Sequence, residues 1–493
     1  MDEMSTSQSP NLTKETVTDE SLIKSVEVTG LFGQFNYEID LTDLVLNASS
    51  SRRLTLLYGD NGCGKTTILN LLWNTLSGSP TGTHRSYLGN CPFATLVIRL
   101  NNGDSISVEK LEDLQGPFQI QVRGSGVDVQ QRYMSIDDDS YFAVGDDGRS
   151  VSEFSRQERE YRLRMERRLR EPRSSIAARR AREQLALFAD QRFDSYVDYL
   201  QGLNANPHFL ADDRQIYGDD LNHSSKQHHR IIRDVEEEGP NDTKSFLGKE
   251  LGSAMRRVHV QFQQQVLRGN QLGSRGTNRI YLDILARIAQ RDFTGGNSSP
   301  IETLLNRLND LAVRTQKYAE FGLVPALRSQ PFANLLTDIP SDKAAVAEEV
   351  ILPYLEAQET RLDALEKTEQ LIRTFVEQAN GFLQTKRLVF DLSRGMRVVA
   401  SDSREHELSP HQLSSGERQI LLLLSNTILA RGNTRLFLID EPELSLNAKW
   451  QRKLMSALLA CTEGSGMQFV VATHSVEVIT GNRDSLSRLV SKD

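Results

Sequence analysis

Alternating apolar and polar positions mark the beginning of the chain. Residues 21–41 alternate with a period of two, as half-buried strands do, and an apolar run at 54–58 leads through a glycine-rich loop into a helical pattern. A second alternating stretch, 93–111, turns at Asn102-Gly103, a pair typical of hairpins, and 117–122 is typical of one more strand. This part of the chain therefore predicts an α/β lobe with an antiparallel β flank.

A helical period dominates the middle of the chain, and alternation returns after it. Residues 123–150 are rich in glycine and aspartate and are expected to form a loop, whereas 151–385 should be mostly helical, with loops at 204–229 and 295–300. The longest helix is predicted at about 350–383. The remaining pattern predicts a hairpin at 386–401, an amphipathic helix, a buried strand at 436–440, a helix from Leu446 to about Cys461 and a strand at 469–474.

Composition excludes several classes of protein. Hydrophobic content of 38% and charged content of 25% are ordinary for a globular chain, and no apolar run approaches the roughly 18–20 residues that span a bilayer. The cysteines Cys63, Cys91 and Cys461 form no close pair, and the start lacks a signal-peptide pattern. We therefore expect a cytoplasmic protein without membrane contacts. Its net charge of −8 provides no overall attraction to nucleic acid.

A phosphate-binding motif follows the first apolar strand. The run Gly59-Asp60-Asn61-Gly62-Cys63-Gly64-Lys65-Thr66 matches GxxxxGK[ST], with a strand before it and a helix after it. Such a loop wraps backbone N–H groups around phosphates at a helix N-terminus, where the helix dipole also favours anions. The lysine reaches the β- and γ-phosphates of ATP, and the hydroxyl binds Mg²⁺. The candidate ATP-contacting residues here are Gly59, Asn61, Gly62, Gly64, Lys65, Thr66 and Thr67.

Acidic residues follow the buried strand at 436–440. Asp440 ends this strand, where open α/β sheets bind ligands, and is the second candidate Mg²⁺ ligand beside Thr66. Glu441 suits the residue that orients or deprotonates the attacking water. His474, at the end of the next predicted strand, is placed to contact the γ-phosphate. The predicted catalytic pair is therefore Glu441 and His474.

Together these motifs resemble the ABC-type ATPase superfamily. Beside the phosphate loop at 59–66, the chain carries Leu413-Ser414-Ser415-Gly416-Glu417, which resembles the signature of that superfamily, and the switch histidine is His474. The resemblance implies that Ser414 and Gly416 of one protomer cap the ATP held by another, so that hydrolysis requires a dimer or a larger oligomer. It also assigns Asn447 to the D-loop and makes Gln215 a weak candidate for the Q-loop glutamine. Phe32, Phe35 and Tyr37 either approach adenine or belong to the core.

The number of residues between the phosphate loop and the signature indicates which branch of the superfamily the chain resembles. More than half of the chain separates them, far more than in transporter ATPases, and this organisation is similar to the RecF/SMC-like branch. We predict an α/β protein whose ABC-type P-loop ATPase lobe, with an antiparallel β flank, is split by a large, mainly α-helical insertion. The expected parts are a disordered tail at 1–20, the N-terminal half of the ATPase domain at 21–122, the insertion at 123–385, which senses or binds a partner, and the C-terminal half at 386–493.

Three stretches, "EPELSLNAKWQ", "LSSGERQILLLL" and "THSVEVI", resemble the OLD family of bacterial anti-phage ATPases. OLD nucleases carry a TOPRIM domain after the switch histidine, and the stretch after His474 is too short for one. The resemblance therefore implies a separate effector nuclease, of TOPRIM type as in PARIS systems or of HNH type as in Septu and retron systems. The chain itself is expected to be an ATPase without nuclease activity that uses ATP and Mg²⁺.

An arginine-rich segment, 156–192, has two possible roles, and only one of them involves a binding partner. Glutamates interspersed at helical spacing favour a solvated, salt-bridged helix, and a surface for DNA or for an acidic phage trigger protein is the alternative. The rival function is a RecF/SMC-like DNA-binding ATPase in DNA repair or maintenance.

Overall fold

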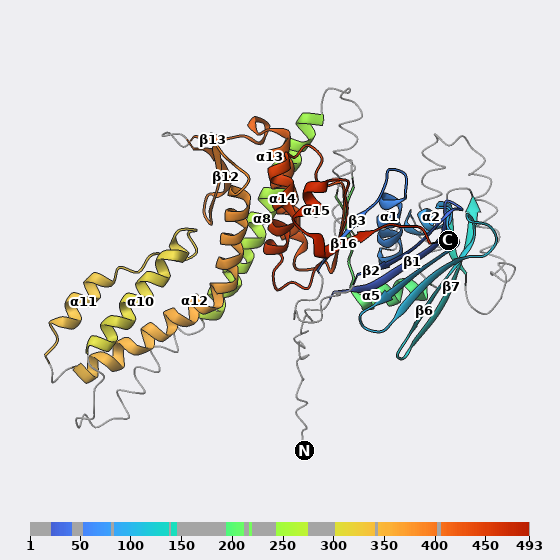
Figure 1. The fold of residues 1–493 in the computed structure, drawn as a ribbon. Helices are drawn as coiled ribbons and strands as arrows, with labels where there is room; N and C mark the ends of the chain where they lie inside the picture. The colour runs from blue at the N-terminus through green and yellow to red at the C-terminus, as the bar shows by residue number, and fades with distance from the viewer. Residues whose placement is uncertain are drawn as a thin grey trace, which may run out of the picture.

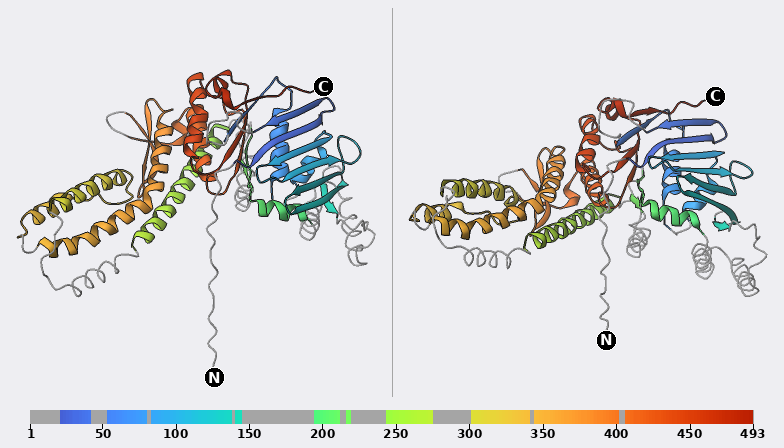
Figure 2. Two further views of the ribbon diagram at one scale, coloured as in Figure 1. Left: turned by 60° about the horizontal axis from the view of Figure 1, so that its bottom comes forward. Right: turned by 90° about the horizontal axis from the view of Figure 1, so that it is seen from below.

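The computed structural model describes residues 21–41, 53–79, 83–137, 140–144, 194–211, 216–218, 243–274, 301–340, 344–401 and 406–492. These residues form an antiparallel sheet, a mainly parallel central sheet, a small third sheet and an arm of helices that extends away from them (Figures 1 and 2). The predicted α/β fold, with a β flank and a helical middle, is confirmed. The tail at 1–20, the arginine-rich segment 156–192 and Gln215 lie outside the described residues.

The β flank is a seven-stranded sheet in the order β2-β1-β4-β5-β6-β7-β8. Its strands are β1 (Ile23–Leu31), β2 (Phe35–Asp40), β4 (Thr95–Leu100), β5 (Ser105–Lys110), β6 (Phe118–Gly124), β7 (Val127–Asp137) and β8 (Ser140–Val144). The predicted hairpin at Asn102-Gly103 is confirmed. The predicted loop at 123–150 is wrong for 127–137 and 140–144, because its glycines form a tight turn between β6 and β7 rather than breaking the sheet.

The central sheet has the strand order β10-β9-β14-β15-β3-β16. Its parallel strands are β3 (Leu54–Tyr58), β9 (His208–Leu210), β14 (Leu436–Asp440), β15 (Gln468–Ala472) and β16 (Leu486–Arg488), and β10 (Ile216–Gly218) pairs antiparallel with β9. The predicted loop at 204–229 is therefore wrong where β9 and β10 lie. These strands are too short to show a period, and only their pairing in the folded sheet makes them strands.

Two hydrophobic cores cover the two faces of this sheet. Because successive strand residues face opposite sides, Phe437 and Ile439 enter one core and Leu436 and Leu438 the other. The core that contains Leu436 and Leu438 also includes α1 (Lys65–Leu76), α2 (Thr83–Asn90), α5 (Ser195–Leu203) and the β flank. The core that contains Phe437 and Ile439 also includes α8 (Thr243–Ser274), α13 (Ser415–Ala430), α14 (Ala448–Cys461) and α15 (Val476–Thr480). Figure 1 shows α1 and α13 on opposite sides of β3.

The arm consists of α10 (Ile301–Ala319), α11 (Ser329–Thr337) and α12 (Ala344–Asn380). Ion pairs join α10 to α12, with Arg307 2.7 Å from Glu359 and Arg314 2.6 Å from Asp363. The predicted long helix at about 350–383 is confirmed as α12, which reaches the small sheet at its C-terminal end. No helix among the described residues is long and apolar enough to cross a bilayer.

The small sheet contains β11 (Lys386–Asp391), β12 (Gly395–Ala400) and β13 (Glu407–Leu408), and it confirms the predicted hairpin at 386–401. The short turn η3 (Pro410–Gln412) connects it to α13, and η4 (Arg483–Ser485) precedes β16. The small sheet and α8 therefore flank the segment that leads into the signature.

Candidate active site

The carboxyl edge of the central sheet gathers residues from distant parts of the chain. Asp440 is paired in register with Ala472, and Ala472 with Leu57, so β14, β15 and β3 end at the same level. The next residues along each strand are Glu441, Thr473 and Tyr58. Open α/β sheets bind their ligands at this edge.

The loop at 59–66 lies at this edge and leads into α1. Gly64 is the N-cap of α1 with φ of +88°, in the left-handed region, and a Cβ there would meet Leu31 Cδ2 at 2.8 Å. No side chain caps the helix, so its first N–H groups face the loop without a side-chain acceptor. Thr66 is exposed in the first turn, and Thr67 follows it, half-buried. The loop thus has the shape and the donors of an anion site.

Lys65 is buried at the base of the loop, with 5% of its surface exposed. Its Nζ donates to the carbonyl oxygens of Gly59, at 2.9 Å, and Asp60, at 3.0 Å, and lies 3.5 Å from His474 Nδ1. These carbonyls and the histidine hold the cation at the carboxyl edge, where a phosphate bound to the loop would compete for it.

His474 joins the lysine to an acidic residue of the neighbouring strand. Its Nε2 lies 3.3 Å from Glu441 Oε1, so Lys65, His474 and Glu441 form a continuous chain of contacts across β3, β15 and β14. Glu441 adopts φ of +45°, a left-handed conformation that is uncommon for a side chain of this kind. Its N–H donates to Ala472 O at 2.9 Å, which fixes this turn against β15. Such local strain is often found at functional sites.

Glu443 was missed by the sequence reasoning and organises this edge. Its Oε1 accepts hydrogen bonds from Thr473 Oγ1 at 2.6 Å, His474 N at 2.8 Å and Ser475 N at 3.0 Å. Glu443 is buried, and it therefore holds the backbone that carries His474. Only its position two residues after Glu441, in "DEPE", could have drawn attention to it.

The aromatic residues near the loop divide into two groups. Tyr37 is buried and donates to Cys63 O at 2.8 Å; burial raises the pKa of this phenol to about 12, so it stays a neutral donor. Phe32 is 42% exposed, has φ of +54° and lies close to Gly64. Tyr37 thus belongs to the core, and half-buried Phe35 stacks on its ring at 5.8 Å, whereas the Phe32 ring is exposed beside the loop.

The signature opens α13 on the other face of the sheet. Ser414 is the N-cap: its Oγ accepts from Glu417 N at 3.3 Å, and its N–H donates to Glu417 Oε2 at 2.7 Å. Burial acts to raise the pKa of Glu417, but hydrogen bonds from Lys386, at 2.7 Å, and Ser414 outweigh it and hold that pKa below its usual value. A Cβ on Gly416 would meet Ser445 O at 2.9 Å, so the helix packs tightly on the turn before α14.

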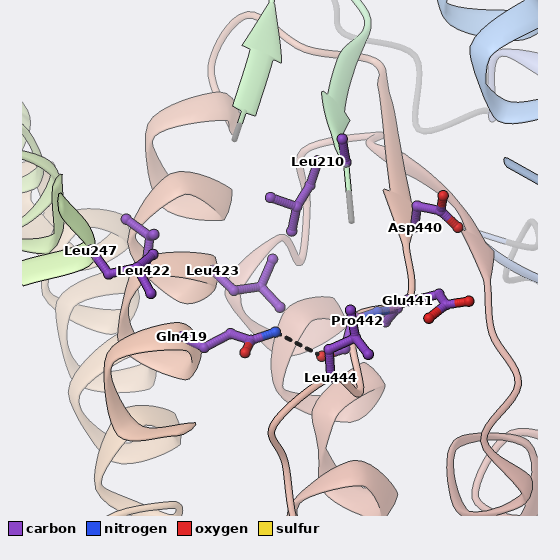
Figure 3. A pocket seen from close by; sticks show the side chains of 10 residues that line it. Leu210, Leu247, Gln419, Leu422, Leu423, Asp440, Glu441, Pro442 and Leu444 are labelled. Carbon is purple, nitrogen blue, oxygen red and sulfur yellow. Dashed lines mark hydrogen bonds between the residues drawn. The ribbon is translucent and has the colours of Figure 1, made fainter. Parts of the chain in front are cut away.

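A pocket connects α13 with the acidic end of β14 (Figure 3). Leu422 and Leu423 line it from α13, and Gln419 Nε2 donates to Pro442 O at 3.4 Å. The carboxylates of Asp440 and Glu441 point away from these leucines, toward the other side of β14. The signature helix therefore touches the turn that carries Glu441 within one chain.

The predicted site residues fall into two sets. The loop residues Gly59, Asn61, Gly62, Gly64, Lys65, Thr66 and Thr67 share the carboxyl edge with Asp440, Glu441 and His474. Ser414 and Gly416 do not join them: among the described residues, no hydrogen bond or ion pair links either to the loop, and α13 packs in the other core. Asn447 caps α14, accepting from Trp450 N at 3.0 Å.

Comparison with known proteins gives two family matches. A model described as "AAA domain" matches residues 31–387, more than half of the chain, and one described as "AAA domain, putative AbiEii toxin, Type IV TA system" matches 354–480. No curated protein matches the chain.

Among solved structures, the chain is similar to an Smc head domain with an extended coiled coil, bound to the C-terminal domain of ScpA and derived from Pyrococcus furiosus. The identity is 14%, the match covers 96% of each chain, and the TM-score is 0.34. It is also similar to an Smc head domain with a coiled coil and joint from Pyrococcus yayanosii, at 15% identity, 96% and 97% coverage, and a TM-score of 0.32.

Proposed function

The chain belongs to the AAA-domain family of ATPases, and on that premise we propose that it is an ABC-type ATPase that works as a conformational switch. The observation that carries this proposal is the chain of contacts Lys65–His474–Glu441 at the carboxyl edge of the central sheet. Glu441 and His474 follow the ends of β14 and β15, and Lys65 opens α1 after the loop that follows β3, so folding alone brings a cation, an imidazole and a carboxylate together at an anion-binding loop.

The proposed reaction is attack of water on the γ-phosphorus of ATP. The bond from this phosphorus to the bridging oxygen breaks, and ADP and phosphate leave. Glu441 orients the water and accepts its proton, Lys65 and the loop N–H groups bind the β- and γ-phosphates, and His474 contacts the γ-phosphate. Phosphoryl transfer depends mainly on positioning and on charge stabilisation, which is the work that these groups can do.

Mg²⁺ fits the donor set at this edge. Thr66 supplies an exposed hydroxyl in the first turn of α1, and Asp440 a carboxylate at the end of β14, both hard oxygen donors of the kind that Mg²⁺ prefers. When bound, the ion neutralises charge on the phosphates. Among the described residues no cluster of three or more His, Cys, Asp or Glu forms a metal cage, and Mg²⁺ commonly uses one or two protein oxygens together with substrate phosphates.

We further propose that two chains share each ATP. Ser414 and Ser415 are exposed at the N-terminus of α13, and this helix lies in the core on the opposite face of the sheet from α1. The exposed N-terminus of a helix favours anions, so the signature suits the phosphates of an ATP held by a second copy. Self-association into a dimer or a larger oligomer then completes the catalytic site.

The helical arm is the proposed output of the switch. α8 packs against α13 and α12, and His411, in the turn before the signature, lies against α8 at Gly248. A shift of the signature on ATP binding therefore moves α8 and the arm. The partner we propose is a separate effector nuclease of an anti-phage system, and the family description of a putative toxin in a type IV TA system, matched by 354–480, favours a toxin–antitoxin context.

The test uses Glu441→Gln, which keeps the shape of the side chain and removes its basicity. With ATP and Mg²⁺, this variant should hydrolyse at least about 100-fold more slowly than wild type and accumulate as an oligomer in light scattering. Affinity purification of this variant from cells that express its native operon should then recover a stoichiometric nuclease. If Glu441→Gln hydrolyses ATP at the wild-type rate, Glu441 is not the catalytic base. If the variant stays a monomer without a partner in the presence of ATP, the proposed conformational switch is wrong.

The arginine content of segment 156–192 supports a second candidate function, that of a RecF/SMC-like ATPase that binds DNA. Binding of duplex DNA measured against salt concentration separates the two. A steep negative slope of log affinity against log salt, lost when arginines of this segment are replaced by glutamine, would support DNA maintenance. Absence of binding at low salt would leave the effector switch.

A further inference from the structure

A second cleft, of about 260 Å³, lies between α8 and the small sheet, away from the loop at 59–66. Arg256 and His259 line it from α8, Arg394 and Arg397 from the turn and strand β12, and Glu407 from β13. Nothing in the proposed hydrolysis of ATP uses these residues.

The cleft carries an excess of positive charge. Among the residues that the structure describes, three arginines line it against one glutamate. That glutamate is weakly engaged, because Arg397 Nη1 lies 3.9 Å from Glu407 Oε2 and the Glu407 side chain is 61% exposed. Arg397 Nε is buried and has no hydrogen-bond partner among the described residues. His259 Nε2 is occupied by Leu392 O at 3.0 Å. The arginines therefore favour an anion with more than one charge.

The remainder of the lining is apolar. Met255, Met396, Val398, Leu408 and Leu413 contribute to it. An inorganic ion would leave this half without a partner, and a DNA duplex presents mainly phosphates to a protein surface. A ligand with a phosphorylated end and a flat apolar end satisfies both halves.

We propose that this cleft is a binding site for a nucleotide-sized organic phosphate, separate from the hydrolytic site. The arginines bind the phosphates, and the methionines and aliphatic residues contact the base. Methionine suits such a surface because its flexible, polarizable side chain adapts to rings.

The cleft borders the signature. Pro410 and Leu413 line it, and Leu413 directly precedes Ser414. A ligand in the cleft therefore contacts the segment that leads into the exposed serines, and its occupancy adjusts the position of the signature.

The experiment measures AMP-PNP bound per chain by equilibrium dialysis. Wild type should bind two equivalents, the double variant Arg256→Ala/Arg397→Ala one, and the control Arg328→Ala, an exposed arginine of the arm, two. Arg394 is exposed in a turn, so Arg394→Ala should leave folding unchanged. It should lower the affinity for the second AMP-PNP about tenfold. Unchanged melting temperatures establish that the variants fold.

One equivalent in wild type, or two in the double variant, would overturn the proposal. A single-stranded DNA oligonucleotide is measured in parallel: arginine-dependent binding of the oligonucleotide without a second AMP-PNP would assign the cleft to nucleic acid instead. Lys65→Ala keeps the two proposals apart, because it should remove only the first equivalent. If Lys65→Ala removes neither, the hydrolytic assignment fails while the arginine result still decides the cleft.

Discussion

The two faces of the central sheet hold their functional residues in different ways. On the α1 face, Lys65, His474 and Glu441 contact one another across three strands, so the arrangement is complete within one folded chain. On the α13 face, the hydrogen bonds of Ser414 among the described residues go to Glu417 and Arg418 of its own helix, and Ser414 remains exposed. Folding thus assembles the first set within one chain, whereas the second set is completed by a second copy of the chain only in the function proposed above.

Mixing two inactive variants tests this comparison with the largest effect. Lys65→Ala disables the loop and Ser414→Arg the signature, and each alone should lower hydrolysis at least about 100-fold, because both groups stabilise phosphate charge. In an equal mixture, half of the dimers pair one intact loop with one intact signature. Hydrolysis should therefore return to about a quarter of the wild-type rate, as expected for a twofold assembly with two shared sites. A mixture as inactive as its components would show that the signature does not act between chains.

Glu443→Gln tests the α1 face through a residue that positions His474 and takes no direct part in hydrolysis. The amide oxygen can take the place of Oε1 but carries no negative charge, so the three hydrogen bonds that hold 473–475 become weaker and His474 is positioned less firmly. Hydrolysis should fall about tenfold, and the free energy of unfolding by roughly 1–3 kcal/mol, as expected when hydrogen bonds to a buried charged group become bonds to a neutral one. Glu463→Gln, at an exposed turn after α14, is the control and should change neither. A variant with full activity would mean that Glu443 does not position the histidine.

Lys386→Met tests the α13 face through pH. Glu417 has a lowered pKa in the folded chain, so its contribution to stability is present above its unfolded pKa and is lost as pH falls through the folded value. At neutral pH the variant should be less stable by about 1 kcal/mol, because it leaves Glu417 without its cation. The difference from wild type should shrink as pH falls below the unfolded pKa of Glu417, about 4.3, and through its lower value in the folded chain. Denaturant unfolding of both proteins at several pH values measures this difference in stability. A difference that does not change with pH would show that the Lys386–Glu417 ion pair is not its cause.

The smallest expected effect concerns Ser445, which adopts φ of +66° beside Gly416. Glycine takes this conformation without strain, and this gain offsets its larger entropy in the unfolded chain. Ser445→Gly should therefore change the free energy of unfolding by less than about 0.5 kcal/mol. Ser456→Gly, at an exposed position inside α14, should lose about 0.5 kcal/mol from helix propensity alone. A larger loss in Ser445→Gly than in Ser456→Gly would show that the Ser445 side chain itself supports the turn.

The sequence predicted what depends on neighbours along the chain. The strand, loop and helix around Lys65, and the strand that ends at Asp440, follow from local periodicity and from glycine positions. It missed β9 and β10, because three-residue strands have no period of their own. It took β7 and β8 for a loop because of the glycines and aspartates of the stretch 123–150 that contains them. The place of Glu443 depends on contacts with 473–475, which no local pattern reveals.

The order of strands in the central sheet has a consequence for the timing of synthesis. β3 carries the loop at 59–66, yet its two neighbours are β15 and β16, the last two strands that the structure describes. Ribosomes add about 5–20 residues per second, so the roughly 400 residues between Tyr58 and β15 delay these neighbours by about 20–80 s. Until then β3 lacks both partners, and the edge that joins Lys65 to His474 cannot form. Capacity to bind ATP at this edge is therefore acquired only after β15 has been synthesised, whatever folds earlier.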